Sequence, residues 1–468
     1  MNSKGQKRRG KDYRKQNKKR THLCSNLHPV CFFTPSMLLY SHYLAADGHI
    51  STDSRQPQPG TLFFALNGPS FRGAAFAPQA LEKGAAHAVV DDAALAATDP
   101  ARYTFDPDPL RALQKLAHHH RRQFNIPVLA ITGSNGKTTT KELLTAVLAQ
   151  KFRVLATIGN LNNHIGVPLT LLRLRAGEHD FAVIEMGANH RGEIAAYCEW
   201  AEPTHGLITN IGKAHREGFG GAEGVALGKG ELVDYLARTS GTAFVNTLDA
   251  RLPALAAAVL TRLTYPSPTD TYPATLLSAD PAVALRLADG TDLAAQLTGD
   301  YNFPNLAAAA AVGLHFGISA DKTAAALARY TPQNNRSQLL RTAANNDLIL
   351  DAYNANPSSM TAALRSFAAR PAAAGQLKLA ILGDMFELGD DSAIEHHQLG
   401  QLLAKLPLPQ VLLIGSEMAG AATAASHFQH FATKAEAAEW LRQHPVRGQQ
   451  VLVKGSRGMA LETLVELL

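Results

Sequence analysis

Cysteine is scarce in this chain of 468 residues, which holds only Cys24, Cys31 and Cys198. Three scattered cysteines cannot form a disulfide framework or a zinc cluster, so the sequence indicates a reducing compartment. Long apolar runs are lacking as well, since no stretch of about 18 apolar residues occurs. We therefore expect a cytoplasmic protein without membrane insertion.

Apolar residues are nevertheless present in ordinary amount, with 46% hydrophobic and 18% charged residues. This balance is typical of globular proteins rather than of disordered or fibrous ones. A single core stops growing beyond about 250–300 residues, so a chain of this length should form about two to four domains.

Positive charge is concentrated at the amino end. Residues 1–22 hold ten Lys or Arg and one Asp, a net charge of +9, whereas the rest of the chain has a net charge of −3. A signal peptide is the alternative, but Pro35 breaks the apolar stretch that follows and no small-residue cleavage site is clear. We interpret residues 1–36 as a disordered, solvated extension that binds no nucleic acid, and we hypothesise that Met37 is the true start.

The remaining sequence divides into three blocks, 37–106, 107–336 and 337–468. Short apolar runs alternate with helical patterns, which is typical of α/β domains built on parallel sheets. We expect a small N-terminal α/β domain, a central domain with a parallel sheet, and a C-terminal Rossmann-like domain.

Seven apolar runs in the second and third blocks end at or near polar, acidic or glycine residues. They are 128–131, 181–185, 206–209, 348–350, 379–384, 411–415 and 451–455. Ligands of open parallel sheets bind at the carboxyl ends of the strands, so functional side chains are expected there.

The strongest motif is Thr132-Gly133-Ser134-Asn135-Gly136-Lys137-Thr138-Thr139, which lies between an expected strand and an expected helix. Its glycines let backbone N–H groups turn toward phosphate oxygens, and the helix start adds a positive dipole end. Lys137 can reach the β- and γ-phosphates, and Thr138 can offer a hydroxyl to Mg²⁺. The usual first glycine would fall at Ile131. A chance Gly-Lys-Thr in a surface turn is the alternative, but the flanking strand and helix favour an ATP site.

Two further residues are candidates for chemistry. Glu185 ends an apolar strand, where a carboxylate suits Mg²⁺, although a salt-bridged or capping Glu is an equal alternative. His215 precedes a glycine-rich turn, and a lone histidine is more often structural than catalytic. The run His118-His119-His120 is interpreted as a solvated helix face.

These segments resemble the superfamily of Mur ligases and folylpolyglutamate synthases, in which the missing first glycine is normal. The segment 160–168, the Glu185 strand and the His215 turn contribute to the resemblance. Tyr301-Asn302-Phe303-Pro304-Asn305 resembles the adenine site of the superfamily, with Tyr301 in place of a histidine. The resemblance covers about residues 45–468.

Within this superfamily, three stretches resemble the Mur ligases that add D-alanyl-D-alanine to UDP-N-acetylmuramoyl-tripeptide. The stretches are 351–360, 382–389 and 453–459. The resemblance implies an acyl phosphate made from the tripeptide carboxylate and ATP, which the amine of the dipeptide then attacks. It also implies a monomer whose third domain closes on the second.

The resemblance also implies residue assignments. ATP contacts would be Gly133, Ser134, Asn135, Gly136, Lys137, Thr138, Thr139, Asn302, Asn305, Arg336 and Asp351. Substrate contacts would be Ser54, Arg55, Asn354 and Asn356, the first two with uridine diphosphate. Ligands of two Mg²⁺ ions would be Thr138, Glu185, His215 and a carbamylated Lys229, and the catalytic residues would be Lys137, His215 and Lys229. Apart from the resemblance, Lys229 would be interpreted as a plain surface lysine.

Three alternatives remain at this stage. Another ligase of the same superfamily would join a different amine, such as diaminopimelate, lysine or glutamate. A P-loop switch or kinase would need a guanine-specificity motif or a phosphoacceptor site, and neither is visible. A nucleic-acid binder would depend on the basic extension.

Overall fold

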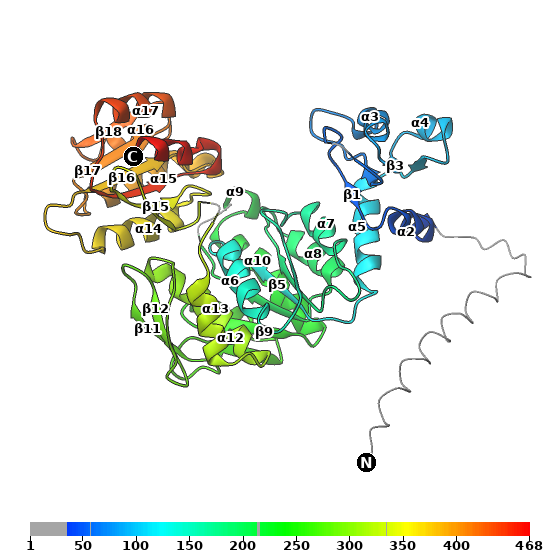
Figure 1. Ribbon diagram of the computed structural model, residues 1–468, viewed down its shortest axis with the longest axis horizontal. Helices are drawn as coiled ribbons and strands as arrows, with labels where there is room; N and C mark the ends of the chain where they lie inside the picture. Colours follow the sequence, from blue (N-terminus) through cyan, green and yellow to red (C-terminus); the bar gives the residue numbers. More distant parts are fainter. Residues whose placement is uncertain (1–34, 57, 213–215, 334) are drawn as a thin grey trace, which may run out of the picture.

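The computed structural model describes residues 35–56, 58–212, 216–333 and 335–468. They form three lobes, each on its own main sheet, which confirms the expected three-domain α/β fold (Figure 1). The first lobe (blue) and the third (yellow to red) stand apart above the central lobe (cyan to green). None of the described helices combines the length and the apolar character that crossing a membrane requires.

The first lobe is a parallel sheet of four short strands in the order β1-β2-β3-β4. The strands are β1 (Ile50–Ser51), β2 (Leu62–Phe64), β3 (His87–Val90) and β4 (Tyr103–Phe105). Its helices are α2 (Pro35–Ala45), η1 (Gly73–Phe76), α3 (Ala77–Glu82) and α4 (Ala93–Thr98). Strands β2 and β3 are buried along their whole length, as expected for strands covered on both faces.

The central lobe is a six-stranded parallel sheet in the order β10-β9-β8-β5-β7-β6. Its strands are β5 (Val128–Thr132), β6 (Val154–Ala156), β7 (Phe181–Glu185), β8 (His205–Ile208), β9 (Thr242–Asn246) and β10 (Thr261–Tyr265). Strand β5 lies in the middle, between β7 and β8, so the loop that follows β5 opens at the centre of the carboxyl edge.

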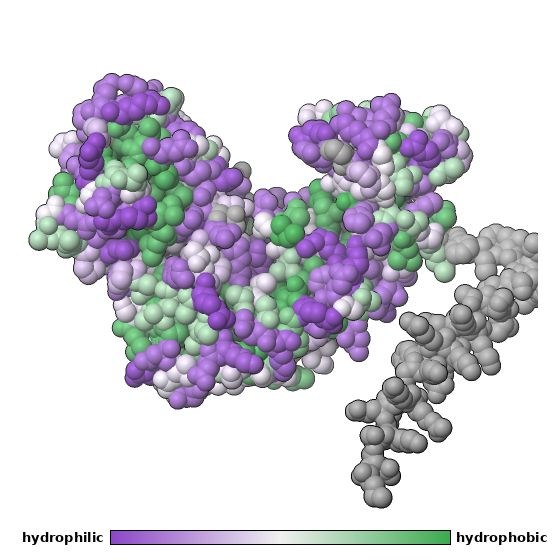
Figure 2. Space-filling model, viewed as in Figure 1, coloured by the Kyte–Doolittle hydropathy of each residue, from purple (hydrophilic) through white to green (hydrophobic). Residues whose placement is uncertain are grey.

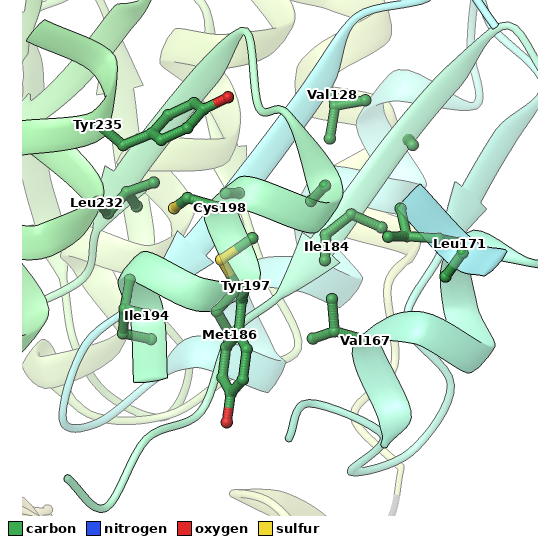
Figure 3. Packing of buried hydrophobic residues seen from close by; sticks show 14 of the residues in the cluster. Val128, Val167, Leu171, Ile184, Met186, Ile194, Tyr197, Cys198, Leu232 and Tyr235 are labelled. Atoms are coloured by element: carbon green, nitrogen blue, oxygen red, sulfur yellow. The ribbon is translucent and has the colours of Figure 1, made fainter. Parts of the chain in front are cut away.

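Alternate residues of these strands enter two cores, one on each face of the sheet. Val128 and Ile184 join the core that α5, α7, α8 and α10 cover (Figure 3). Leu129 and Val183 join the opposite core, under α6, α12 and α13. The helices are α5 (Pro109–Arg121), α6 (Lys137–Leu148), α7 (Gly166–Leu171), α8 (Glu193–Ala201), α9 (Arg216–Phe219), α10 (Ala222–Arg238), α11 (Arg251–Leu255), α12 (Phe303–His315) and α13 (Ala320–Arg329).

A small antiparallel sheet, absent from the sequence-based expectation, adjoins the central lobe. Its strands are β11 (Ala274–Ser278), β12 (Ala284–Leu287) and β13 (Asp292–Ala294). Leu285 and Leu293 of this sheet extend the core under α12. The short 3-10 helix η2 (Asp300–Asn302) then leads into α12.

The third lobe has a six-stranded sheet in the order β14-β15-β19-β16-β17-β18, in which only β14 is antiparallel to its neighbour. The strands are β14 (Gln338–Arg341), β15 (Asp347–Asp351), β16 (Lys378–Gly383), β17 (Gln410–Ile414), β18 (Phe428–Phe431) and β19 (Gln450–Lys454). The helices are α14 (Pro357–Ala369), η3 (Gly389–Asp391), α15 (Ser392–Leu403), α16 (Ala419–Ala422), α17 (Lys434–Gln443), η4 (Arg457–Met459) and η5 (Leu461–Leu467). All seven expected strands of the second and third blocks are present within two residues of their predicted ends.

The interpretation of His118–His120 as a solvated face was wrong for its last member. His120 is buried, and its Nε2 lies 3.1 Å from the Tyr43 hydroxyl and 3.0 Å from the Leu174 carbonyl oxygen. Burial lowers the pKa of His120 to about 4, which keeps the ring neutral. His118 instead faces Glu202, with its Nε2 2.8 Å from the carboxylate.

Candidate active site

The phosphate-binding motif forms the turn between β5 and α6, as the sequence predicted. Gly133 and Gly136 have positive φ angles of 138° and 78°, which L side chains rarely adopt. A Cβ at Gly133 would lie 2.0 Å from Thr209 Oγ1, and one at Gly136 would lie 2.6 Å from Asn305 Oδ1. A residue other than glycine is therefore disfavoured at both positions, by the positive φ angle and by the lack of room for a Cβ.

Lys137 lies at the first position of α6 and folds back over its own loop. Its Nζ donates to the carbonyl oxygens of Gly133 (2.8 Å) and Ser134 (3.2 Å). Burial lowers the pKa of Lys137, while the nearby Glu185 carboxylate opposes this shift. The ammonium group is thus held at the mouth of the loop, where a bound phosphate would meet it.

Glu185 is buried at the carboxyl end of β7, next to the loop. Its Oε1 accepts hydrogen bonds from Thr138 Oγ1 (3.0 Å) and Asn162 Nδ2 (2.8 Å). Its Oε2 is buried without a hydrogen-bond partner among the described residues. An orphaned carboxylate oxygen beside a threonine hydroxyl is an arrangement that a hard cation can complete.

Asn302 and Asn305 lie at the start of α12 and contact the helix that follows the loop. Thr140 Oγ1 donates to Asn305 Oδ1 (3.1 Å), and Asn305 Nδ2 donates to Asn302 Oδ1 (3.1 Å). Asn302 Nδ2 in turn donates to the Thr298 carbonyl oxygen (2.8 Å). The two amides therefore fix α12 against α6 at the edge of the site.

Arg336, at the boundary between the central and third lobes, lines the same space as three residues of the third lobe, Asp351, Tyr353 and Lys454. The guanidinium of Arg336 lies 3.8 Å from the centroid of the Tyr353 ring, a cation–π contact. Lys454 Nζ donates to Asp351 Oδ2 at 2.5 Å, and this lysine is buried. Because Asp351 neutralises Lys454, Arg336 is the cation of this group that no carboxylate contacts among the described residues.

The central and third lobes enclose a cavity of about 1110 Å³ around these groups, below the open gap between the first and third lobes (Figure 2). Thirteen of the predicted site residues line it: Ser134, Asn135, Gly136, Lys137, Thr138, Thr139, Glu185, Asn302, Asn305, Arg336, Asp351, Asn354 and Asn356. The chain thus brings together side chains that lie more than 200 residues apart in the sequence.

Lys229 lies outside the cavity lining, within α10, and only 1% of its surface is exposed. Its Nζ donates to the Ala188 carbonyl oxygen (3.1 Å) and lies 5.0 Å from the centroid of the Phe219 ring. Burial, together with the charge of Lys137, lowers the pKa of Lys229 to about 7. The interpretation as a plain surface lysine is therefore wrong.

The two substrate candidates of the first lobe are not at the cavity. Ser54 is buried and its Oγ donates to Gln79 Oε1 (3.2 Å), whereas the Arg55 side chain is 84% exposed and pairs with Asp53 (2.8 Å). The Arg55 guanidinium lowers the pKa of Asp53 to about 2. His215 lies outside the described residues.

Several cavity residues were not singled out from the sequence. Asn162, Tyr353, Lys454 and Arg457 lie within stretches that carried the family resemblance, so closer inspection of those stretches could have identified them. Arg251, which pairs with Asp249 (2.9 Å) beside the loop, has no signal in the sequence.

Known protein families match the chain in its order of domains. Three family models match the chain: "Mur ligase family, catalytic domain" over residues 48–121, "Mur ligase middle domain" over residues 131–313, and "Mur ligase, glutamate ligase domain" over residues 335–457. Together they span the three lobes.

Two relatives illustrate the similarity in sequence. The UDP-N-acetylmuramoyl-tripeptide–D-alanyl-D-alanine ligase of Escherichia coli (strain K12) is 36% identical over 429 residues, which cover 90% of this chain and 93% of the relative. The protein of the same name from Bacillus subtilis (strain 168) is 32% identical over 433 residues, 89% of this chain and 92% of the relative.

Two solved structures are similar over the whole fold. MurF from Acinetobacter baumannii has a TM-score of 0.81 at 32% identity, covering 91% of this chain and 97% of that chain. MurF ligase from Thermotoga maritima in complex with ADP has a TM-score of 0.77 at 25% identity, covering 90% and 96%.

Proposed function

This chain belongs to the Mur ligase family, and we propose that it uses ATP to join D-alanyl-D-alanine to UDP-N-acetylmuramoyl-tripeptide. The products are UDP-N-acetylmuramoyl-pentapeptide, ADP and phosphate, a step of peptidoglycan precursor synthesis. The observation that carries the proposal is one cavity in which Lys137 and Glu185 of the central lobe face Asn354 and Asn356 of the third. The names of the similar ligases support the choice of substrates.

The reaction that we propose has two steps. The terminal carboxylate of the tripeptide attacks the γ-phosphorus of ATP, which forms an acyl phosphate and releases ADP. The amine of D-alanyl-D-alanine then attacks the acyl carbon, loses a proton, and inorganic phosphate leaves. Positioning and positive charge are the main requirements of this chemistry, and a phosphate loop with Lys137 and Arg336 supplies both.

The nucleotide would lie along the loop between the central and third lobes. In this proposal the backbone of residues 133–139 holds the phosphates, Lys137 acts on the transferred phosphate, and Arg336 reaches the phosphates from the boundary with the third lobe. Asn302 and Asn305 would meet the adenine, and Asp351 the ribose. The ADP bound to the Thermotoga maritima ligase supports a nucleotide in this fold.

Magnesium fits this cavity, because Glu185 holds an unpartnered, buried Oε2 next to the Thr138 hydroxyl. We propose Thr138 and Glu185 as protein ligands of one Mg²⁺, and His215 with Lys229 at a second. Bound there, the ions would neutralise phosphate charge. Among the described residues no cluster of three or more His, Cys, Asp or Glu exists, so phosphate oxygens would complete the coordination.

Carbamylation would convert Lys229 from a cation into an oxygen ligand. The neutral amine attacks CO₂, a C–N bond forms, and one proton is released to solvent. Only the neutral amine reacts, and burial supplies it by lowering the pKa of Lys229 to about 7. The burial of this lysine beside Ala188 supports the proposal.

The first lobe would hold the uridine diphosphate part of the substrate through Ser54 and Arg55, while Asn354 and Asn356 would contact the dipeptide. The blocks 37–106, 107–336 and 337–468 are the proposed domains for these three tasks. We propose that the chain works as a monomer, since all proposed contacts come from one chain.

Purified protein tests the function directly. UDP-N-acetylmuramoyl-tripeptide, containing either lysine or diaminopimelate, is incubated with ATP, Mg²⁺ and one amine, and product mass and phosphate release are measured. D-Alanyl-D-alanine should stimulate phosphate release and give a product heavier by the dipeptide less one water. Equal stimulation by free diaminopimelate, lysine or glutamate would overturn the proposal in favour of another ligase of the superfamily.

A further inference from the structure

A closed ring of hydrogen bonds joins the phosphate loop to the third lobe, and the proposed reaction does not require it. Asn356 Nδ2 donates to Asn135 Oδ1 (2.7 Å), Asn135 Nδ2 donates to Ser358 Oγ (3.1 Å), and Ser358 Oγ donates to Asn356 Oδ1 (2.9 Å). We call Asn135, Asn356 and Ser358 the clasp. Each of its three side chains donates one hydrogen bond and accepts one within the ring.

The clasp is anchored in the third lobe by the start of α14. Asn356 is the N-cap of this helix, and its Oδ1 also accepts from the backbone N–H of Ser359 (2.9 Å). The Ser359 hydroxyl lies 3.1 Å from the backbone nitrogen of Asn356, which completes a capping box. The side chains of Asn356 and Ser358 therefore move with α14 as a unit.

The other end of the clasp is anchored within the central lobe. The backbone N–H of Asn135 donates to Asn210 Oδ1 (3.1 Å). Its carbonyl oxygen accepts from Thr209 Oγ1 (2.6 Å) and from Asn210 Nδ2 (3.0 Å). Asn135 is two residues before Lys137, so its position determines the course of the loop that holds the phosphates.

The clasp occupies space that is free because Gly212 has no side chain. A Cβ at this position would lie 2.9 Å from Ser358 Oγ and 3.2 Å from Asn135 Nδ2. The same Cβ would lie 3.1 Å from Ser134 Cβ. A side chain at Gly212 would therefore displace the Ser358 hydroxyl from the ring.

We propose that Ser358 is a positioning residue, which acts through Asn135 to hold the phosphate loop in its nucleotide-binding course when the third lobe is in place. The inference rests on the proposed function only in treating the loop as the phosphate site. The clasp exists only while α14 lies against the loop, so nucleotide binding and the placement of the third lobe are coupled. Such a coupling is reciprocal: each event favours the other by the same factor.

The test measures ADP affinity by calorimetry on the full chain. Ser358→Ala removes the donor to Asn356 and the acceptor of Asn135, and should weaken ADP binding about three- to tenfold, the range of one net neutral hydrogen bond. Ser358→Thr keeps the hydroxyl and should restore most of the affinity. Ser366→Ala, on the same helix, is the matched control, since no hydrogen bond of its side chain occurs among the described residues.

A double-mutant cycle separates the clasp from a general loss of stability. Asn135→Ala should also weaken ADP binding, and Asn135→Ala with Ser358→Ala should be little weaker than the worse single variant, because all three variants break the same ring. Gly212→Ala should reproduce the effect of Ser358→Ala without removing any hydrogen-bonding group.

Two results would overturn the proposal. One is an ADP affinity of Ser358→Ala equal to that of Ser366→Ala. The other is a double variant whose loss is the product of the single losses, since independent effects multiply. Failure of the proposed function is a separate observation: a wild-type chain that binds ADP yet ligates no D-alanyl-D-alanine would reject the ligase assignment and leave the ADP measurements valid.

Discussion

At the residue scale, Lys137 is held by the carbonyl oxygens of its own loop, although burial makes its charge costly. An ammonium group that is half-buried and donates to two carbonyl oxygens is stabilised further when a phosphate arrives, because the charges attract at close range. The loop therefore keeps a cation at the cavity, where a bound anion would stabilise it.

Replacing Lys137 by Ala should lower the ligase rate by about 10²–10³-fold, as expected when a main electrostatic contact to the reacting group is lost. Lys322→Ala, on the exposed face of α13, should retain the wild-type rate and serves as the control. Phosphate release in the presence of all substrates measures both. A Lys137→Ala protein that still ligates at the wild-type rate would reject the assignment of the loop.

The proposed carbamylation of Lys229 predicts that the ligase rate depends on pH and on bicarbonate. Its pKa is lowered to about 7, so the neutral amine is the minor form below that pH and the major form above it. Carbamate formation uses the neutral amine and releases a proton, so both effects favour the carbamate as the pH rises. At limiting bicarbonate, the ligase rate should therefore increase as the pH rises through about 7, and added bicarbonate should help most on the acid side.

Lys229→Ala should be slow and insensitive to bicarbonate, whereas Lys322→Ala should keep the wild-type response. Intact-protein mass spectrometry under mild conditions would detect added CO₂ on the wild-type chain and not on Lys229→Ala. A wild-type rate that is equal in bicarbonate-free and bicarbonate-rich buffer would argue against the carbamate.

Single residues differed in how far the sequence could identify them. Lys137 could be predicted because it begins the helix after the glycine-containing loop that follows β5, and Glu185 because it ends the recognisable strand β7. Lys229 could be placed only by resemblance, since its burial arises from Ala188 and Phe219, which are not its neighbours in the sequence. Arg251 could not be predicted, because its place beside the loop depends on the packing of α11.

At the scale of elements, α12 holds α6 through polar contacts. Asn305 links Thr140 of α6 to Asn302, and all three side chains are buried. The helix that follows the phosphate loop is thus held in place by the segment that resembles the adenine site of the superfamily.

Asn305→Ala should lower the free energy of unfolding by about 1–3 kcal/mol, because it leaves the Thr140 hydroxyl and the side-chain Oδ1 of Asn302 buried without their Asn305 partner. The thermal midpoint by scanning calorimetry should fall accordingly. Gln150→Ala, in the exposed turn just after α6, should leave the midpoint near the wild-type value. Equal midpoints for the two variants would contradict the bracing of α6 by Asn305.

Elements with continuous apolar runs were predictable, and others were not. Strand β7 was predicted with its observed ends because all five residues are buried, so every one is apolar except the terminal Glu185. Strand β11 has exposed residues at its centre and no regular alternation, which leaves no periodic signal. Strands β6 and β4 have three residues each, too few for a pattern.

At the scale of the whole molecule, the proposed function places a different substrate contact on each of the three lobes. Domain number and class could be predicted from the alternation of strands and helices. The relative placement of the lobes could not, because contacts such as Asn135 to Ser358 join residues 223 positions apart.

Ligand binding should draw the lobes together. With ADP, Mg²⁺ and both peptide substrates present, small-angle X-ray scattering should show a smaller radius of gyration than for the free chain, because substrates bound to separate lobes must meet at one reacting carbon. Ser358→Ala should require more ADP for the same decrease. An unchanged radius at saturating ligand would contradict closure.

The distance between the first lobe and the cavity also has a consequence for the choice of precursor. Ser54 and Arg55 are not among the residues that line the cavity at the loop. A precursor anchored by its uridine diphosphate can present a carboxylate to the loop only if its peptide is long enough to span the interval. The chain would then discriminate against precursors with a shorter peptide, because their terminal carboxylate could not reach the loop.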